Sequence, residues 1–328
     1  MNADLALHVT NGGAANDVLG RARIGGSYLS WDDCLHEGPI PGGLDLDALS
    51  RSRALYLAGQ RFGAVPTITR RMQQRNDTLR DHAPDGEVYF WSTPELYDQL
   101  HLWQLLDWYA TEGAHLPPAH IVWLDTYFSH LSDDALEAAL EGAQAVDSET
   151  RSQGVAVWTA IRAADPTGLP ALGDASDRLP FTGDAIRRFV QEFPEKATGL
   201  CRTERQLLEA LRDGPEAPGT LFRSNQGAEE VAFMGDWSFW RVVDRLMDVA
   251  EPAVAIVGGS AFGYPPRVDP GSDRFREQRL RLTPFGEALC RGEADFIASN
   301  GVDRWQGGVH LKPGNDWRRD GNRLLKVG

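Results

Sequence analysis

The first 165 residues alternate between short apolar runs and longer segments in which apolar residues recur every three or four positions. Runs of the first kind, bounded by turn residues, predict buried strands over 5–9, 27–31, 87–91 and 120–128. The second spacing predicts helices over 14–20, 46–63, 67–82, 94–110, 133–143 and 147–164. Buried strands separated by helices favour an α/β fold with a mainly parallel, Rossmann-like sheet and flanking helices.

The second part of the chain has a different pattern, and the boundary is expected near 195–200. A stretch rich in Gly, Pro and Asp over 165–184 predicts an extended connection before one more helix. Three helices are then predicted, over 203–214, 218–226 and 236–250. They are followed by a strand over 253–259, a Gly- and Pro-rich loop and the segment "LTPFGEAL". This order resembles a winged helix-turn-helix. The expected domains are an N-terminal α/β domain (1–165), a linker and helix (166–200) and a winged-helix-like domain (201–328).

Composition is that of an ordinary globular protein, with 42% hydrophobic and 24% charged residues among 328. Apolar runs fall far short of the ~20 residues that a membrane span needs, and the start does not resemble a secretory signal. Three distant cysteines without CxxC spacing argue against a disulfide framework or a zinc ribbon, and they favour a cytoplasmic location. The sequence does not indicate the oligomeric state.

Charge is distributed unevenly. Residues 1–195 carry 14 Lys and Arg against 28 Asp and Glu, a net charge of −14, whereas residues 196–328 carry 19 of each. The acidic first part argues against a broad nucleic-acid surface there, and the neutral second part leaves that question open.

The loop after the first predicted strand, "LHVTNGG", is the first candidate site. Thr10 and Asn11 offer side-chain donors, while Gly12 and Gly13 allow backbone to approach a ligand closely. The motif matches neither a P-loop nor the dinucleotide fingerprint, so no cofactor is identified. A tight turn, in which the glycines supply positive φ, is the alternative.

The loop after the second predicted strand, "WDDCLHEGP", is expected at the same sheet edge. Asp33, His36 and Glu37 could provide acid–base or ligand contacts there. No second histidine completes a zinc set, so no metal site is predicted. Alternatively, Asp32 or Asp33 caps the turn and His36 is a surface residue.

The helix after the third predicted strand begins with "STPELYDQL". The helix can be capped at its amino end by Thr93-Pro94, or by a capping box of Ser92 with Glu95. Its two apolar stripes predict that it is buried. A carboxylate in the first turn of a buried helix needs a partner, so Asp98 and Gln99 are candidate ligand contacts. Alternatively, Asp98 complements the helix dipole.

The fourth candidate is the segment "SNGVDRWQGGVHLKPGNDWRRDG", over 299–321. Arg304, Trp305 and His310, followed by further basic residues, could form a phosphate or nucleic-acid patch with aromatic stacking. A solvated basic face is the alternative.

These four stretches together resemble a bacterial family called domain of unknown function 1835. The resemblance rests on "LHVTNGG", "WDDCLHEGP", "ELYDQLHLWQLL" and "GEADFIASNGVDRWQGGVHL", the last being similar to the companion domain of unknown function 3658. The chain departs from the family pattern at Gly13-Ala14 and Thr93-Pro94, where groups suited to acid–base or metal chemistry are expected. The resemblance implies an architecture and no established reaction.

Two functions follow as hypotheses, and whether the protein is an enzyme stays open. In the first, the N-terminal domain binds a small anionic or nucleotide-like ligand, with His36, Asp33 and Asp98 as candidate catalytic groups. In the second, the winged helix binds DNA and the N-terminal domain is a sensor. Its expected recognition helix carries more acid (Asp236, Asp244, Asp248) than base (Arg241, Arg245). The expected wing carries Arg267, Arg274, Arg276, Arg279 and Arg281. A packing or protein-interaction module is the third alternative.

Overall fold

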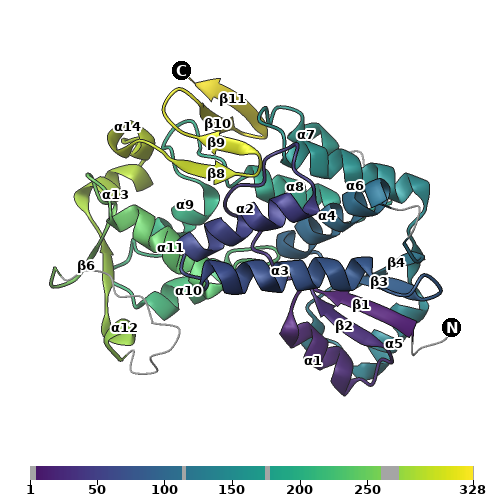
Figure 1. Ribbon diagram of the computed structural model, residues 1–328. Helices are drawn as coiled ribbons and strands as arrows, with labels where there is room; N and C mark the ends of the chain where they lie inside the picture. Colours follow the sequence, from purple (N-terminus) through teal and green to yellow (C-terminus); the bar gives the residue numbers. More distant parts are fainter. Residues whose placement is uncertain (1–4, 113–115, 174–177, 260–272, 328) are drawn as a thin grey trace. The chain divides into compact units, whose positions relative to one another are not determined.

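A computed structural model of the chain describes residues 5–112, 116–173, 178–259 and 273–327 (Figure 1). The chain forms two compact units. The first consists of Met1–Arg188 together with Trp305–His310, and the second of Phe189–Arg304 together with Leu311–Gly328.

The first unit contains a five-stranded sheet in the order β2-β1-β3-β4-β5. Its strands are β1 (Ala6–Thr10), β2 (Ser27–Ser30), β3 (Glu87–Ser92), β4 (Ala119–Trp123) and β5 (Gln144–Ala145). The first four are parallel and β5 is antiparallel to β4, which confirms a mixed α/β fold with a mostly parallel sheet.

Two strands differ from the sequence prediction. The fourth strand ends at Trp123, and a 3₁₀ turn, η2 (Phe128–His130), occupies the end of the run predicted as strand. The two residues of β5 were not predicted, because so short an edge strand has no alternating pattern.

Helices cover both faces of this sheet (Figure 1). One face packs on α1 (Gly13–Arg21) and α5 (Asp133–Glu141), with Tyr89 and Trp91 of β3 in their shared apolar cluster. The intervening Phe90 points to the other face and meets Tyr109 edge-on, with ring centroids 5.3 Å apart. This alternation is the period-2 pattern of a strand buried on both sides.

The opposite face carries the remaining larger helices of the unit. They are α2 (Leu46–Gly59), α3 (Val65–Arg80), α4 (Leu96–Glu112) and α6 (Ser148–Ile161), with α7 (Leu169–Leu172) and α8 (Thr182–Val190) following. As its two apolar stripes predict, α4 is buried over most of its length, and it packs against α6. The indole N–H of Trp103 on α4 donates to Thr182 Oγ1 at 3.2 Å, which holds the start of α8.

The segment Trp305–His310 belongs to the first unit although it lies near the end of the chain. Gly307 O accepts from Ile40 N at 3.1 Å, and Gly308 N donates to Ile161 O at 2.9 Å. A Cβ at Gly308 would lie 1.9 Å from the carbonyl oxygen of Arg162, so only glycine fits there. The paired glycines of this motif therefore permit close backbone packing.

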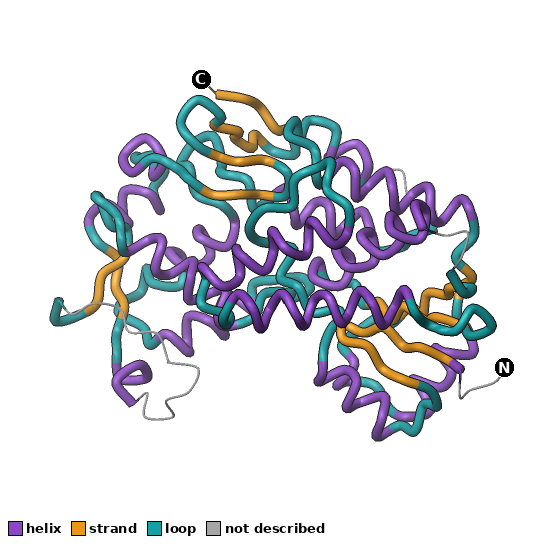
Figure 2. Tube along the Cα trace, in the orientation of Figure 1, coloured by secondary structure: helices purple, strands orange, loops and turns teal. Residues whose placement is uncertain are grey.

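The second unit is built from short helices and two-stranded sheets (Figure 2). Its helices are α9 (Arg202–Glu209), α10 (Pro218–Gly227), α11 (Asp236–Met247), α12 (Asp273–Glu277), α13 (Pro284–Cys290) and α14 (Phe296–Asn300). Strands β6 (Val254–Ile256) and β7 (Leu280–Leu282) pair antiparallel. Strands β10 (Asp316–Asp320) and β11 (Arg323–Val327) pair antiparallel. The paired strands β8 (Arg304–Gln306) and β9 (Val309–Leu311) lie mostly within the segment Trp305–His310 of the first unit.

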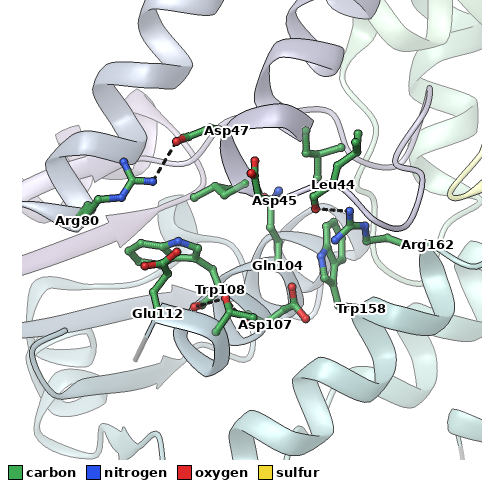
Figure 3. A pocket seen from close by; sticks show the side chains of 13 residues that line it. Leu44, Asp45, Asp47, Arg80, Gln104, Asp107, Trp108, Glu112, Trp158 and Arg162 are labelled. Carbon is green, nitrogen blue, oxygen red and sulfur yellow. Dashed lines mark hydrogen bonds and ion pairs between the residues drawn. The ribbon is translucent and has the colours of Figure 1, made fainter. Parts of the chain in front are cut away.

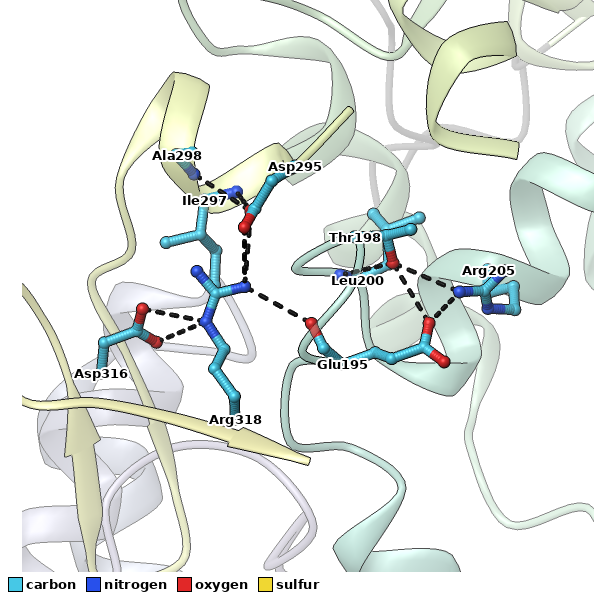
Figure 4. Close-up of polar contacts among 9 residues, drawn as sticks. All are labelled: Glu195, Thr198, Leu200, Arg205, Asp295, Ile297, Ala298, Asp316 and Arg318. Atoms are coloured by element: carbon cyan, nitrogen blue, oxygen red, sulfur yellow. Dashed lines mark hydrogen bonds and ion pairs between the residues drawn. The ribbon is translucent and has the colours of Figure 1, made fainter. Parts of the chain in front are cut away.

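A buried arginine connects β10 to α14 in the second unit (Figure 4). Arg318 Nε donates to both carboxylate oxygens of Asp316, at 2.8 and 2.9 Å, and its Nη1 lies 3.3 Å from Asp295. Asp295 also accepts the N–H groups of Ile297 and Ala298 at the start of α14. The charge of Arg318 is thus neutralised within the fold.

Across the described part of the chain, no helix combines the length and apolarity that crossing a bilayer requires.

Replacement of Gly308 tests the close packing of the C-terminal motif. Gly308→Ala should lower the free energy of unfolding by about 1–3 kcal/mol, because backbone must move to admit the methyl group. Gly59→Ala is the matched control, since open space surrounds a Cβ there and alanine favours a helix. Equal urea midpoints for the two variants would contradict this packing.

Candidate functional site

The strand order places a topological switch point between the carboxyl ends of β1 and β3. The chain leaves β1 for β2 on one side, while β3 lies on the other side of β1. In open α/β sheets, ligands bind at such a point, beyond the carboxyl ends of the strands. A cavity of about 10 Å³, room for about one water molecule, lies here. It is lined by Val9, Thr10, Asn11, Trp31, Phe90, Trp91, Ser92, Asp98, His101, Leu102 and Leu105.

The predicted loop after β1 is held from within. Thr10 is buried, and its hydroxyl lies 2.5 Å from Asn16 Oδ1, so this group serves the loop itself. Asn11 Nδ2 donates to Asp98 Oδ1 at 2.8 Å. Two of the sequence-predicted stretches, "TNGG" and "ELYDQL", therefore meet through a direct hydrogen bond.

The amino end of α1 is open to solvent. Gly12, at φ 155°, is the N-cap residue and forms no side-chain cap. Gly13 and Ala14 are exposed, and apart from the chain neighbours and the backbone of α1 no heavy atom of the described residues lies within 4 Å of a Cβ built on Gly12 or Gly13. The first N–H groups of a helix lack intrahelical acceptors, so they can bind an anion.

A pair of carboxyl groups lies beside this loop at the start of α4. Burial raises the pKa of Asp98, although hydrogen bonds from Asn11 and from Thr93 N, the latter at 3.0 Å, act in the opposite direction. Burial also raises the pKa of Glu95, to about 8, and the charge of Asp98 adds to that shift. The pair therefore holds a proton at neutral pH and can donate or accept one.

Gln99 stabilises the turn between β3 and α4. Its Nε2 donates to Ser92 Oγ at 2.9 Å and to Thr93 O at 2.7 Å. The side chain is fully buried, so it shapes the edge of the site from behind.

Asp33 forms a buried ion pair with Arg53 of α2. The guanidinium donates through Nε and Nη2 to the carboxylate at 2.8–3.0 Å, and both side chains are buried. Burial by itself would raise the pKa of Asp33, but the Arg53 charge and hydrogen bonds hold it below its ordinary value. Arg53 also donates to the carbonyls of Glu37 and Cys34, so the pair fixes the loop after β2.

The two histidines near this loop are buried. The ring of His36 lies 6.0 Å from that of Tyr97, and the neighbouring Glu37 carboxylate is 3.4 Å from the hydroxyl of Tyr56. His101 Nε2 donates to Asp33 O at 2.7 Å, and burial lowers the pKa of its ring to about 4. His101 is thus a neutral group that connects the loop to the cavity wall.

The predicted residues do not all come together. One edge of the sheet brings together Thr10, Asn11 and Asp98, with Gln99 buried behind them. Of the candidate catalytic groups, Asp98 is the one that lines the small cavity at this edge. Asp33 and His36 line no part of that cavity. The rings of Trp305 and His310 stack on each other, with centroids 4.5 Å apart. Arg304, in the second unit, donates to Glu192 O at 2.8 Å.

Sequence reasoning missed three residues that shape this edge: Glu95, Arg53 and His101. Glu95 was interpreted only as a capping residue, although its position one turn before a buried Asp98 was a signal that the two carboxyl groups interact. Arg53 and His101 have no local signal, because their partners lie 20 and 68 positions away in the chain.

Neither a metal-ligand cluster nor a similarity to known proteins adds a residue to this site. Among the residues that the structure describes, no three His, Cys, Asp or Glu side chains gather as metal ligands would. No family model matches the sequence, and no curated protein matches it. The site is therefore defined by its geometry.

Loss of the buried carboxylate should destabilise the first unit. Asp33→Asn should cost about 3–5 kcal/mol of unfolding free energy, because it leaves the Arg53 charge buried without its counterion. Asp32→Asn is the matched control, since Asp32 meets Arg71 at 3.5 Å in a pair that is partly exposed. Similar urea midpoints for the two variants would mean that Arg53 is stabilised by its carbonyl contacts alone.

The raised pKa of Glu95 predicts a pH dependence of stability. A carboxyl whose folded pKa is raised contributes stability that is present below its ordinary pKa of 4.5 and is lost as pH rises toward about 8. Glu95→Gln should therefore flatten the fall in thermal midpoint across this range, while Glu137→Gln, on the exposed side of α5, should not. Parallel pH profiles for wild type and Glu95→Gln would exclude this role.

Proposed function

We propose that the first unit binds a small anionic, nucleotide-like ligand at the carboxyl edge between β1 and β3. The observation that carries the proposal is the uncapped, exposed amino end of α1 directly after the switch point. Gly12 and Gly13 leave this surface open, so a ligand atom can reach the backbone N–H groups.

Each group at this edge has a role in the proposed complex. The N–H groups of Gly13 and Ala14 bind the anion. Asn11, which is hydrogen-bonded to Asp98, places the carboxyl pair beside it. Because Glu95 and Asp98 hold a proton at neutral pH, they can donate a hydrogen bond to the ligand or accept one from its hydroxyl groups. The existing cavity holds about one water molecule, so the ligand lies mainly over the open surface.

Family membership and location are part of the same proposal. We propose that the chain belongs with domain of unknown function 1835, since two of the motifs behind the resemblance meet at this edge through Asn11 and Asp98. The three cysteines are free, and burial raises the pKa of the Cys34 and Cys201 thiols. Free thiols with a raised pKa carry little thiolate, which supports a reducing, cytoplasmic environment.

A second candidate function, DNA binding, rests on the order of elements in the second unit. Helices α9, α10 and α11 precede the antiparallel pair β6–β7, and Glu216 forms a bridge with Leu280 of β7, which supports a winged-helix arrangement. Arg276, Arg279 and Arg281 are exposed near this hairpin. Arg267 and the side chain of Arg274 lie outside the described residues.

The charges on α11 make DNA the weaker alternative. Arg245 donates to the buried carboxylate of Glu204 at 2.8 Å, and Arg241 pairs with Asp244 at 3.3 Å. Asp236, at the start of this helix, is exposed. A helix that uses its arginines internally and exposes an acid first is poorly suited to reading a major groove.

A charge placed at the amino end of α1 tests the anion site. AMP, ATP and inorganic phosphate should be titrated against wild type, Gly13→Asp and Gly13→Asn by thermal shift and calorimetry. Gly13→Asp should weaken nucleotide binding about tenfold or more, because the new carboxylate repels the anion across a few ångströms. Gly13→Asn has nearly the same shape without the charge and should retain binding.

Both variants should fold, since open space surrounds a Cβ at this position. The proposal fails when none of the three probes binds wild type, or when Gly13→Asp binds as wild type does. Steeply salt-dependent binding of duplex DNA, with no nucleotide effect, would instead favour the second candidate.

A further inference from the structure

A second, larger cavity lies in the first unit, away from the carboxyl edge (Figure 3). Its volume is about 250 Å³, close to the lower end of the ~300–1,000 Å³ range of small-molecule sites. The start of α2, the end of α3, the second half of α4 and the end of α6 form its walls. No described residue lines both this cavity and the smaller one at the carboxyl edge, although Gln104 and Leu105 of α4, one in each wall, are neighbours. The two cavities are therefore distinct.

Two indole rings form part of the wall. Figure 3 shows Trp108 of α4 and Trp158 of α6 at different sides of the cavity, with Gln104 between them. The face of an indole attracts a positive charge more strongly than any other aromatic side chain does. The guanidinium of Arg162 already lies over the Trp158 ring, 5.6 Å from its centroid, so Trp108 is the indole that is left to a cationic ligand.

The charges that line the cavity are mainly negative. Its lining includes four carboxylates, those of Asp45, Asp47, Asp107 and Glu112, and two guanidinium groups, those of Arg80 and Arg162. The fold already uses both arginines. Arg162 donates to Pro41 O and Leu44 O at 2.7–3.1 Å, and Arg80 pairs with Asp47 at 3.3 Å.

Two acids of α4 are left to meet a ligand. Among the described residues, none forms a hydrogen bond or salt bridge with the carboxylate of Asp107 or Glu112. Asp107 is half-buried, and this burial raises its pKa although the charge of Arg162 opposes the shift. A cation in the cavity would stabilise the ionised form of Asp107.

The indole N–H of Trp108 is the second observation that indicates a ligand. Its side chain is 4% exposed, and within the described part of the chain Nε1 has no acceptor. A buried donor without an acceptor costs roughly 1–3 kcal/mol, so a ligand oxygen at this position would remove that cost.

From these contacts we propose that this cavity binds a small organic cation that carries a hydrogen-bond acceptor. The positive charge lies between Trp108 and the carboxylates of Asp107 and Glu112, and the acceptor oxygen meets Trp108 Nε1. A metal ion fits less well, because the described residues contain no cluster of three or more side chains with metal-ligand chemistry.

Choline and its neutral isostere 3,3-dimethyl-1-butanol form a matched pair of probes, since they differ in charge and share the hydroxyl. Acetylcholine and ethanolamine, each of which also carries an acceptor oxygen, extend the test to an ester and to a primary ammonium compound. In calorimetry, at least one of the three cations should bind wild type saturably, and the neutral isostere should bind at least about tenfold more weakly than the tightest-binding cation.

Two variants test the carboxylate contact and the indole contact separately. Asp107→Asn should weaken cation binding about tenfold or more, and Trp108→Phe should weaken it severalfold while keeping an aromatic ring. Asp134→Asn, an exposed acid on α5, is the control and should bind as wild type does. Thermal unfolding of each variant verifies that it is folded before affinities are compared.

The proposal is overturned if none of the three cations binds, if the neutral isostere binds as tightly as the tightest-binding cation, or if Asp107→Asn and Trp108→Phe bind as wild type does. The result is independent of the anion site, because Gly13→Asp should leave cation binding unchanged.

Discussion

The ion pair between Asp33 and Arg53 is the interaction on which the first unit depends. It neutralises two buried charges, and the same guanidinium donates to the carbonyls of Glu37 and Cys34. His101 of α4 reaches the backbone of Asp33 from the other side. The loop after β2 is thereby fixed between α2 and α4, and the first turn of α4 presents Asp98 to Asn11 in the loop after β1. Removing one partner would leave a buried charge without compensation, which the small net stability of a folded domain does not easily tolerate.

Local patterns predicted much of this architecture. The apolar strand runs and helical spacing gave the parallel strands and the buried α4, because these features depend on periodicity within a few residues. They did not reveal that Asp33 pairs with Arg53, or that Gly307 and Gly308 pack on Ile40 and Ile161. Those contacts join residues far apart in the chain and leave no periodic signal. The hairpin β10–β11 was missed for a related reason: its strands are short and rich in charge, and Arg318 becomes buried only because Asp316 and Asp295 neutralise it.

The candidate site shows the same limit. Asn11 and Asp98 were each singled out from sequence, but their hydrogen bond depends on the sheet order, which brings the ends of β1 and β3 together. His36 looked accessible in a polar loop, whereas the fold buries it near Tyr97. The larger cavity had no sequence signal at all, since its acids and indoles come from three helices, α2, α4 and α6. The first unit thus offers an anion-binding helix end and a cavity suited to a cation, at different positions along α4.

The backbone amide resonances at the amino end of α1 provide the most direct measurement. In a nitrogen–proton correlation spectrum recorded during titration with ATP, the signals of Gly13 and Ala14 should shift saturably, as N–H groups that bind an anion do. The signal of Asn11 should move with them, because its side chain is hydrogen-bonded to Asp98. Saturable shifts confined to residues around Trp108, or to the second unit, with Gly13 and Ala14 unmoved, would contradict an anion site at this edge of the sheet.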